Sequence, residues 1–180
     1  MKKIVLLGFP GAGKTTIAKK LANVLRCDYV DLDQELESYY KTNIPIFMSK
    51  YGESTFRKCE YDRLKKMLLK PVEKNLIIST GGGTPCFFDA IDLINEHATS
   101  IYVKMSEKSL FVRLTNAKKK RPLLQGMNNE DLEKYVHEML ALREPFYEKA
   151  KIVVKGENFN VDELVKIISD EVEGHLAVSN

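Results

Sequence analysis

The residues with the clearest chemical potential form a glycine-rich segment directly after the short apolar run Ile4-Val5-Leu6-Leu7. This segment, Gly8-Phe9-Pro10-Gly11-Ala12-Gly13-Lys14-Thr15, has the spacing G-x-x-x-x-G-K-[ST]. Small residues at these positions let successive backbone N–H groups point inward around a polyphosphate. The segment therefore predicts a phosphate-binding loop (P-loop), and a glycine-rich turn without a ligand is the alternative.

Two side chains of the P-loop suit the same chemistry. Lys14 can reach the outer phosphates, and the Thr15 hydroxyl can ligate the magnesium ion that such phosphates carry. Residues 16–25 continue as an amphipathic helix, with apolar side chains at positions 17, 18, 21, 24 and 25. The positive end of this helix would lie at the anion, which also favours phosphate binding.

Apolar runs alternate with helical patterns along the chain, which predicts a parallel sheet covered by helices on both faces. The patterns predict strands at 3–7, 29–32, 76–79, 100–103 and 152–154. They predict helices at 14–25, 34–40, 46–50, 54–69, 87–96, 106–115, 129–149 and 161–173. No linker or repeat separates these elements, so we expect one three-layer α/β domain over residues 1–180, with a five-stranded parallel sheet.

The composition limits the classes of partner. The chain has 180 residues, of which 44% are apolar, and its net charge of +3 is too small to indicate nucleic-acid binding. No apolar stretch approaches the roughly 20 residues that span a bilayer. The three cysteines are scattered and form no C-x-x-C pair, which is typical of a reducing compartment. We expect a cytoplasmic monomer without nucleic-acid or membrane partners.

Ligands of parallel sheets bind outside the carboxyl ends of the strands, so polar residues at those ends are candidate site residues. The second strand ends in Asp31-Leu32-Asp33, and residues two apart on an extended segment point the same way. One carboxylate could hold water around magnesium, and the other could bind or deprotonate a hydroxyl. Alternatively, Asp33 is the N-cap of the next helix.

Arg57 and Glu60 are three residues apart on a predicted helix and share a face. Taken alone, this spacing favours a surface ion pair, which contributes little to stability. In a second interpretation, Glu60 braces Arg57 so that its guanidinium group binds a substrate carboxylate through two parallel hydrogen bonds.

The third strand is followed by Gly81-Gly82-Gly83, which could bring bare backbone close to a substrate and hold it through N–H groups. A flexible turn is the alternative. This strand lacks the acidic residue that ends an ordinary Walker B motif, so the carboxylate near magnesium must come from elsewhere. Asp31 is the nearest candidate.

Two further arginines follow. Arg121 comes after Lys118-Lys119-Lys120, in a segment that is either a solvated charge run or a lid whose arginine neutralises charge during phosphoryl transfer. We favour the lid for Arg121 and assign the three lysines to solvent. Arg143 lies just before Pro145, which marks a helix break or kink. Its spacing leaves open whether it points to the site or to solvent.

Taken together, these motifs resemble the shikimate kinase family over nearly the whole chain and in the same order. The resemblance rests on the P-loop, Asp-x-Asp, Gly-Glu-x-x-Phe-Arg with its following Glu, the triple glycine, the Arg-Pro lid and Arg-Glu-Pro-x-Tyr. It implies a P-loop kinase fold of the nucleoside-monophosphate-kinase type. It also implies ATP-dependent phosphorylation of the 3-hydroxyl of shikimate, in the synthesis of aromatic amino acids.

The resemblance also implies a role for each motif residue. It implies a shikimate-binding region at about 33–61 and a lid at about 116–128, with Lys14, Asp33 and Arg121 as the catalytic residues. The ring hydroxyls of shikimate would contact Asp33 and Gly81-Gly82-Gly83, and its carboxylate would contact Arg57 and Arg143, with Glu60 orienting Arg57. ATP would contact Gly11, Ala12, Gly13, Lys14, Thr15, Thr16, Arg113 (beside the adenine) and Arg121. Magnesium would be held by Thr15 and, through water, by Asp31.

Three other classes remain as alternatives. A gluconate kinase or nucleoside-monophosphate kinase would share the fold but take a different acceptor. A nucleotide-binding regulator without turnover is disfavoured by the complete set of Lys14, Thr15, Asp33 and Arg121. A switch GTPase is disfavoured because its Asn-Lys-x-Asp signature is absent from the sequence.

Overall fold

A computed structural model of the chain describes residues 2–117, 126–157 and 159–177, with side chains described as far as residue 170. Its strands are β1 (Lys3–Leu7), β2 (Asp28–Asp31), β3 (Leu76–Ser79), β4 (Thr99–Lys104) and β5 (Ile152–Lys155). They form one five-stranded sheet in the order β2-β3-β1-β4-β5, and every neighbouring pair is parallel. This confirms the predicted parallel α/β sheet.

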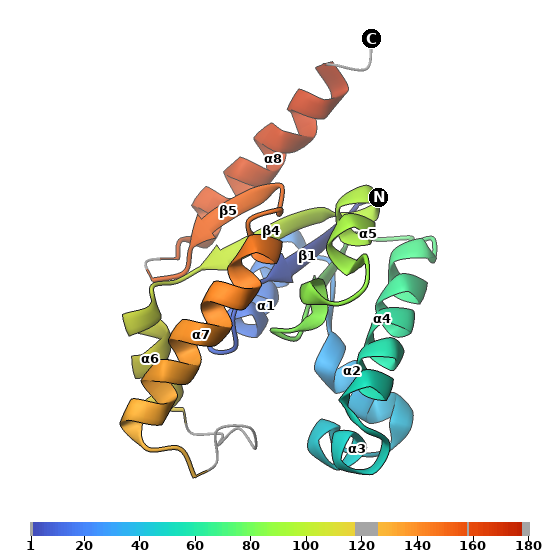
Figure 1. Cartoon of the computed structure of the whole chain (residues 1–180). Coiled ribbons are helices and arrows are strands. Elements are labelled where there is room, and N and C mark those ends of the chain that lie inside the picture. The colour runs from blue at the N-terminus through green and yellow to red at the C-terminus, as the bar shows by residue number, and fades with distance from the viewer. Residues whose placement is uncertain (1, 118–125, 158, 178–180) are drawn as a thin grey trace.

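The helices flank the sheet on both sides (Figure 1). Their bounds are α1 (Lys14–Leu25), α2 (Leu32–Tyr40), α3 (Ile44–Tyr51), α4 (Glu53–Leu69), α5 (Ala90–His97), α6 (Glu107–Thr115), α7 (Asn129–Tyr147) and α8 (Val161–Ala177), with a short 3₁₀ turn, η1 (Thr84–Cys86). Helix α1 packs on β1, β2 and β3 and also contacts α8. On the other face, α5 packs on β4, and both α4 and α7 contact η1.

The central strand β1 explains why the sheet forms where it does. Its residues Ile4, Val5, Leu6 and Leu7 are all buried, because β1 pairs with β3 on one side and β4 on the other and is covered on both faces. A continuous apolar run is the pattern expected of such a strand. The P-loop follows β1 directly, and Gly81-Gly82-Gly83 follows the neighbouring β3. The two glycine-rich segments therefore lie at the same edge of the sheet.

The sequence-based bounds need one correction that bears on the site. Strand β2 ends at Asp31, so Asp33 lies in the first turn of α2, and the expectation that both carboxylates project from one extended segment is wrong. The helix begins early because the Asp31 side chain accepts a hydrogen bond from the Gln34 backbone N–H at 3.2 Å. Asp31, not Asp33, is the N-cap.

Among the smaller differences in extent from the sequence patterns, two concern elements near the site. Helix α5 begins at Ala90 rather than at residue 87. The chain after the glycines first forms the 3₁₀ turn η1, and residues 87–89 connect this turn to α5. Helix α7 continues through Pro145 to Tyr147, so the proline does not end it. Among the described residues, no helix is both long enough and apolar enough to cross a bilayer.

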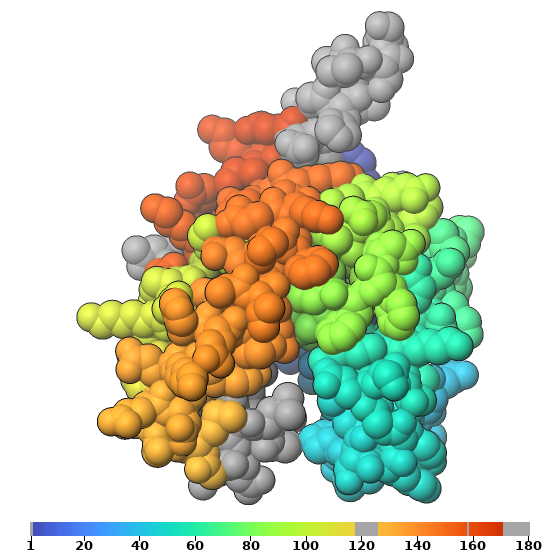
Figure 2. Space-filling model, in the orientation of Figure 1, coloured from blue at the N-terminus to red at the C-terminus, as the bar shows by residue number. Residues whose placement is uncertain are grey.

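The helices form two projections at the same end of the molecule. One contains α2, α3 and α4, and the other contains α6 and α7 (Figures 1 and 2). The first carries Arg57 on α4, and the second carries Arg143 on α7. The residues predicted to bind one substrate carboxylate therefore come from two separate parts of the fold.

Candidate functional site

The P-loop curves between the end of β1 and the start of α1. Gly8, Gly11 and Gly13 have φ angles of 139°, 92° and 97°, which side chains other than glycine rarely adopt. A Cβ atom on Gly8 would also lie 2.8 Å from the Val103 carbonyl oxygen. The loop therefore needs glycine at all three positions for its curvature, and at Gly8 also for its packing against β4.

Lys14 and Arg113 both contact the P-loop backbone. The Lys14 side chain is buried, and its Nζ donates to the carbonyl oxygens of Gly8 and Phe9 at 2.7 and 3.0 Å. Arg113 reaches the loop from α6, where its guanidinium donates to the Ala12 carbonyl oxygen at 3.0 Å. Two cationic groups thus lie at the segment that is predicted to bind phosphates, while Thr16 is exposed in the first turn of α1.

The two residues predicted to hold magnesium contact each other. The Thr15 hydroxyl donates to Asp31 Oδ2 at 2.8 Å, and Ser79, at the end of β3, donates to the same oxygen at 2.9 Å. Burial acts to raise the pKa of Asp31, but hydrogen bonds from Thr15, Ser79, the Gln34 backbone and Tyr29 lower it by more. The pKa of Asp31 therefore lies below its usual value and the carboxylate is ionised at neutral pH.

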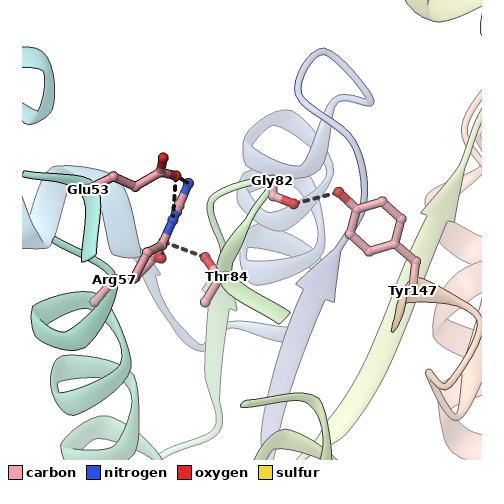
Figure 3. A network of polar contacts seen from close by, with 6 residues as sticks. Glu53, Arg57, Gly82, Thr84 and Tyr147 are labelled. Carbon is pink, nitrogen blue, oxygen red and sulfur yellow. Dashed lines mark hydrogen bonds and ion pairs between the residues drawn. The ribbon is translucent and has the colours of Figure 1, made fainter. Parts of the chain in front are cut away.

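Glu60 joins two parts of the acceptor side, because its carboxylate contacts both Arg57 and Thr84, which are labelled in Figure 3. Its side chain is only 3% exposed, and Oε2 accepts from Arg57 Nη1 at 2.9 Å. The other carboxylate oxygen accepts from the Thr84 hydroxyl at 2.6 Å. This burial is incompatible with a surface ion pair, which was the interpretation that spacing alone favoured.

Arg57 is held from several directions. Glu53 accepts hydrogen bonds from its Nε and Nη2 at 3.2 and 3.1 Å, and the guanidinium lies 4.6 Å from the centre of the Phe87 ring. Burial alone would lower the pKa of Arg57, but Glu60 and Glu53 raise it, so the group stays charged. A charged, oriented guanidinium beside a glycine loop is well suited to bind a carboxylate.

Each glycine of the triplet permits one close approach. A Cβ on Gly81 would lie 2.8 Å from Asp33 Oδ1, and one on Gly83 would lie 2.8 Å from Arg57 Nη2. A Cβ on Gly82 would lie 2.5 Å from Pro10 Cδ, which belongs to the P-loop. None of the three glycines has a positive φ. Their role is close packing rather than an unusual turn.

Arg143 lies on the opposite side of the triplet from α4. Its guanidinium is 5.8 Å from the centre of the Phe9 ring. Burial raises the pKa of the Cys86 thiol to about 11, although Arg143 and Arg57 both act to lower it, so both guanidinium groups lie within electrostatic range of this thiol. Both arginines of the predicted carboxylate site therefore act on the same thiol, which stays protonated at neutral pH.

Arg121 and most of the predicted lid, residues 118–125, lie outside the described residues. The structure brings the other predicted residues to the carboxyl edge of β1, β2 and β3. Sequence reasoning missed Ser79, Thr84 and Tyr147, although Ser79 and Thr84 flank the triplet as polar residues next to an apolar strand. Tyr147 belongs to the Arg-Glu-Pro-x-Tyr motif, but the sequence indicates no role for its side chain.

A separate open pocket of about 490 Å³ lies among α2, α3 and α4. It contains none of the predicted site residues and is lined by Tyr40, Thr42, Ile46, Phe47, Lys50, Tyr51 and Thr55. It is therefore distinct from the P-loop and the glycine triplet.

Comparison with known proteins identifies one family for the chain. The shikimate kinase family model matches residues 10–173. A shikimate kinase of Parabacteroides distasonis is 38% identical over 171 residues, which cover 94% of this chain and 96% of that protein. The crystal structure of shikimate kinase from Bacteroides thetaiotaomicron has a TM-score of 0.86 and 31% identity, over 96% of this chain and 98% of that one.

A third match has a known ligand. Shikimate kinase from Acinetobacter baumannii, solved in complex with shikimate, has a TM-score of 0.82 and 28% identity, over 97% of this chain and 94% of that one. A gluconokinase from Sinorhizobium meliloti is 14% identical with a TM-score of 0.64, which shows a shared fold alone. With a family match across most of its length and a P-loop kinase fold, the chain belongs to the shikimate kinase family.

Proposed function

We propose that the chain transfers the terminal phosphoryl group of ATP to the 3-hydroxyl of shikimate and forms shikimate 3-phosphate. The observation that carries this proposal is the contact between the two glycine-rich loops, where Gly82 packs against Pro10 of the P-loop. The P-loop therefore lies directly beside the glycine triplet, against which Arg57 and Asp33 also pack. An acidic, hydroxylated acceptor bound there would meet the end of the nucleotide.

The acceptor side suits shikimate for chemical reasons. Arg57 and Arg143 supply two guanidinium groups for its single carboxylate, and Glu60 orients Arg57. Asp33, which lies against Gly81, is positioned to accept a hydrogen bond from a ring hydroxyl. Asp33 aligns the attacking hydroxyl or takes its proton, and a loose transition state requires little early proton removal. Fixing the ring contributes most, because it turns a bimolecular encounter into an oriented one.

The nucleotide side follows from the P-loop. Lys14, the P-loop N–H groups and Arg121 would bind the phosphates, and Arg113 would lie beside the nucleotide. The Thr15 hydroxyl and the ionised Asp31 are hard oxygen donors of the kind that magnesium prefers, and Ser79 holds Asp31 in place. Magnesium bound there would neutralise part of the phosphate charge. Turnover is therefore expected to stop in excess EDTA and to return when magnesium is added.

A coupled assay of ADP release tests the proposal with ATP, magnesium and a panel of acceptors. We expect ADP release with shikimate and only background release with gluconate, nucleoside monophosphates or no acceptor. If ADP were released with gluconate or a nucleoside monophosphate and not with shikimate, the protein would be a kinase of the same fold with a different acceptor. Background release with all of them would favour a nucleotide-binding protein without turnover.

We also propose that the protein acts in the cytoplasm as a monomer. Its cysteines, Cys27, Cys59 and Cys86, are all free thiols, as suits a reducing compartment. Light scattering of the purified protein would test the oligomeric state.

A further inference from the structure

The glycine triplet is attached to the rest of the protein on both sides (Figure 3). On the α4 side, the Thr84 hydroxyl donates to Glu60 at 2.6 Å. On the α7 side, the Tyr147 hydroxyl donates to the Gly82 carbonyl oxygen at 2.5 Å. The first attachment belongs to the residues around Arg57, but the second comes from a side chain to which the proposed function gives no role.

Tyr147 is built into the core in a way that fixes its hydroxyl. The side chain is fully buried, and its ring packs on Tyr102 with a centroid separation of 5.2 Å. Burial raises the pKa of Tyr147 and the nearby Cys86 raises it further, whereas Arg143 lowers it through its charge and a hydrogen bond to the hydroxyl. Burial prevails, so the hydroxyl stays protonated and can donate. Tyr147 also lies one helical turn after Arg143, on the same face of α7.

We propose that Tyr147 is a positioning residue for the acceptor site, because its hydroxyl holds the peptide between Gly82 and Gly83 in one orientation. The carbonyl group of Gly82 and the N–H group of Gly83 belong to a single planar trans peptide. A hydrogen bond that fixes the carbonyl therefore also fixes the direction of the N–H. This inference rests on the proposed function, in which the N–H groups of the triplet contact shikimate.

The same bond fixes the spacing between the two arginines. Arg57 lies on α4, and Arg143 lies on α7. The last residue of α7 is Tyr147, which donates to Gly82. Without the Tyr147 hydroxyl, α7 would keep its ring packing but lose its polar attachment to the loop. We expect weaker shikimate binding, with little effect on the nucleotide at the P-loop.

The test compares Tyr147→Phe with Tyr102→Phe. Both variants remove one buried hydroxyl from the same ring pair, but the Tyr102 hydroxyl has no partner at good hydrogen-bond geometry among the described residues, and its weaker interaction is with Glu144 rather than with the triplet. In Tyr147→Phe we expect the KM and Kd for shikimate to rise about tenfold, as for a buried carbonyl left without its donor. The KM for ATP should change less than twofold, and Tyr102→Phe should match the wild type.

A second readout does not depend on shikimate. The Thr84 and Cys86 amides donate to the Gly81 and Gly83 carbonyl oxygens within the loop, at 3.3 and 2.9 Å. Their hydrogen exchange should be faster in Tyr147→Phe than in the wild type or Tyr102→Phe. If Tyr147→Phe does not fold, NMR of the wild type should still show a slowly exchanging Tyr147 hydroxyl proton, and its absence would contradict the proposal.

The two readouts separate this inference from the proposed function. If the wild type binds shikimate and Tyr147→Phe binds it equally well, the positioning role is wrong. If the wild type does not bind shikimate, the proposed function fails, and amide exchange alone decides whether Tyr147 holds the loop. Unchanged exchange would then overturn the inference, and faster exchange would support it.

Discussion

Arg57 and Glu60 form an ion pair away from solvent, so replacing the arginine should have two separable effects. In Arg57→Ala, Glu60 would stay buried without its cation, which should cost about 3–5 kcal/mol of stability. Adding Glu60→Gln should restore much of that stability, because a neutral amide is less costly to bury and can still accept from Thr84. Urea unfolding of both variants measures this difference.

Shikimate binding should not recover in the double variant. Losing a guanidinium that pairs with a desolvated carboxylate should weaken binding by about 2–5 kcal/mol in both variants, measured by calorimetry. Arg63→Ala is a matched control, since Arg63 lies on the same helix and pairs with Glu35 instead. Wild-type affinity in the double variant would remove Arg57 from the carboxylate site.

Asp31 should make the stability of the protein depend on pH in the acid range. Its pKa in the folded state is below the usual value of 3.8, so its contribution is complete at neutral pH and is lost as pH falls through the folded pKa. Asp31→Asn keeps a side chain that can cap α2 but cannot titrate. Wild type should therefore lose more stability than Asp31→Asn between about pH 4 and pH 2.

Urea unfolding across this range, with the exposed Asp28→Asn as a control on the same strand, measures the Asp31 contribution. Parallel acid curves for wild type and Asp31→Asn would show that the hydrogen bonds from Thr15 and Ser79 do not stabilise the ionised carboxylate.

Individual residues of the site could be predicted from sequence more readily than the bonds that hold them. Short local motifs contain Lys14, Arg57 and the glycine triplet, and the residue types in these motifs indicate their chemistry. The Thr84 bond to Glu60 joins positions 24 residues apart, and the Tyr147 bond to Gly82 joins positions 65 apart. No local pattern encodes such contacts, because they depend on how α4 and α7 pack around the loop.

At the scale of elements, the contact between the two glycine-rich loops should tolerate almost no added volume. Gly82→Ala is compatible with the backbone but would place its Cβ 2.5 Å from Pro10 Cδ and 2.6 Å from Pro10 Cγ. Overpacking of this kind should cost about 1–3 kcal/mol of stability. Because the loops would be pushed apart, the affinities for ATP and for shikimate should both fall.

A double-mutant cycle with Pro10→Ala tests the origin of this effect. Removing the proline ring should restore part of the stability and affinity lost in Gly82→Ala, so the two substitutions should not be additive. Additive effects would mean that Gly82→Ala acts on something other than the contact with Pro10.

The boundaries of helices and strands are harder to predict from the sequence than the presence of these elements. The alternation of apolar runs and amphipathic stretches predicted each strand, because a parallel sheet buried on both faces needs continuous apolar strands. The end of β2 was misjudged because Asp31 is chemically able to end a strand and to cap a helix at once. Which role it takes depends on Thr15 and Ser79, which meet it only in the folded sheet.

At the scale of the whole molecule, the order of the strands decides whether there is one site or several. The P-loop and the glycine triplet are about 70 residues apart in sequence, and they meet because β3 pairs with β1. The alternation of strands and helices predicts a parallel sheet but does not predict this order. The family resemblance implies that the P-loop and the glycine triplet form one site. The pattern of apolar residues alone does not predict this.

Because the proposed acceptor site takes residues from both projections of the fold, shikimate should stabilise the whole protein even when no turnover occurs. A ligand at 100 times its Kd adds about 2.7 kcal/mol to the free energy of unfolding. For a chain of this length, that corresponds to a rise in Tm of roughly 5–11 °C. Differential scanning calorimetry with shikimate and without ATP measures it, and gluconate at the same concentration should give no comparable rise.

Arg143→Ala shows whether the α7 side takes part in this stabilisation. At the same shikimate concentration the rise in Tm should shrink in Arg143→Ala, because the carboxylate would keep only Arg57, while the rise with ATP should be unchanged. Lys134→Ala removes a cation whose side chain is 74% exposed on the same helix and should respond as the wild type does. If Arg143→Ala also retained the full rise with shikimate, α4 alone would bind the carboxylate and α7 would serve the fold instead of the acceptor.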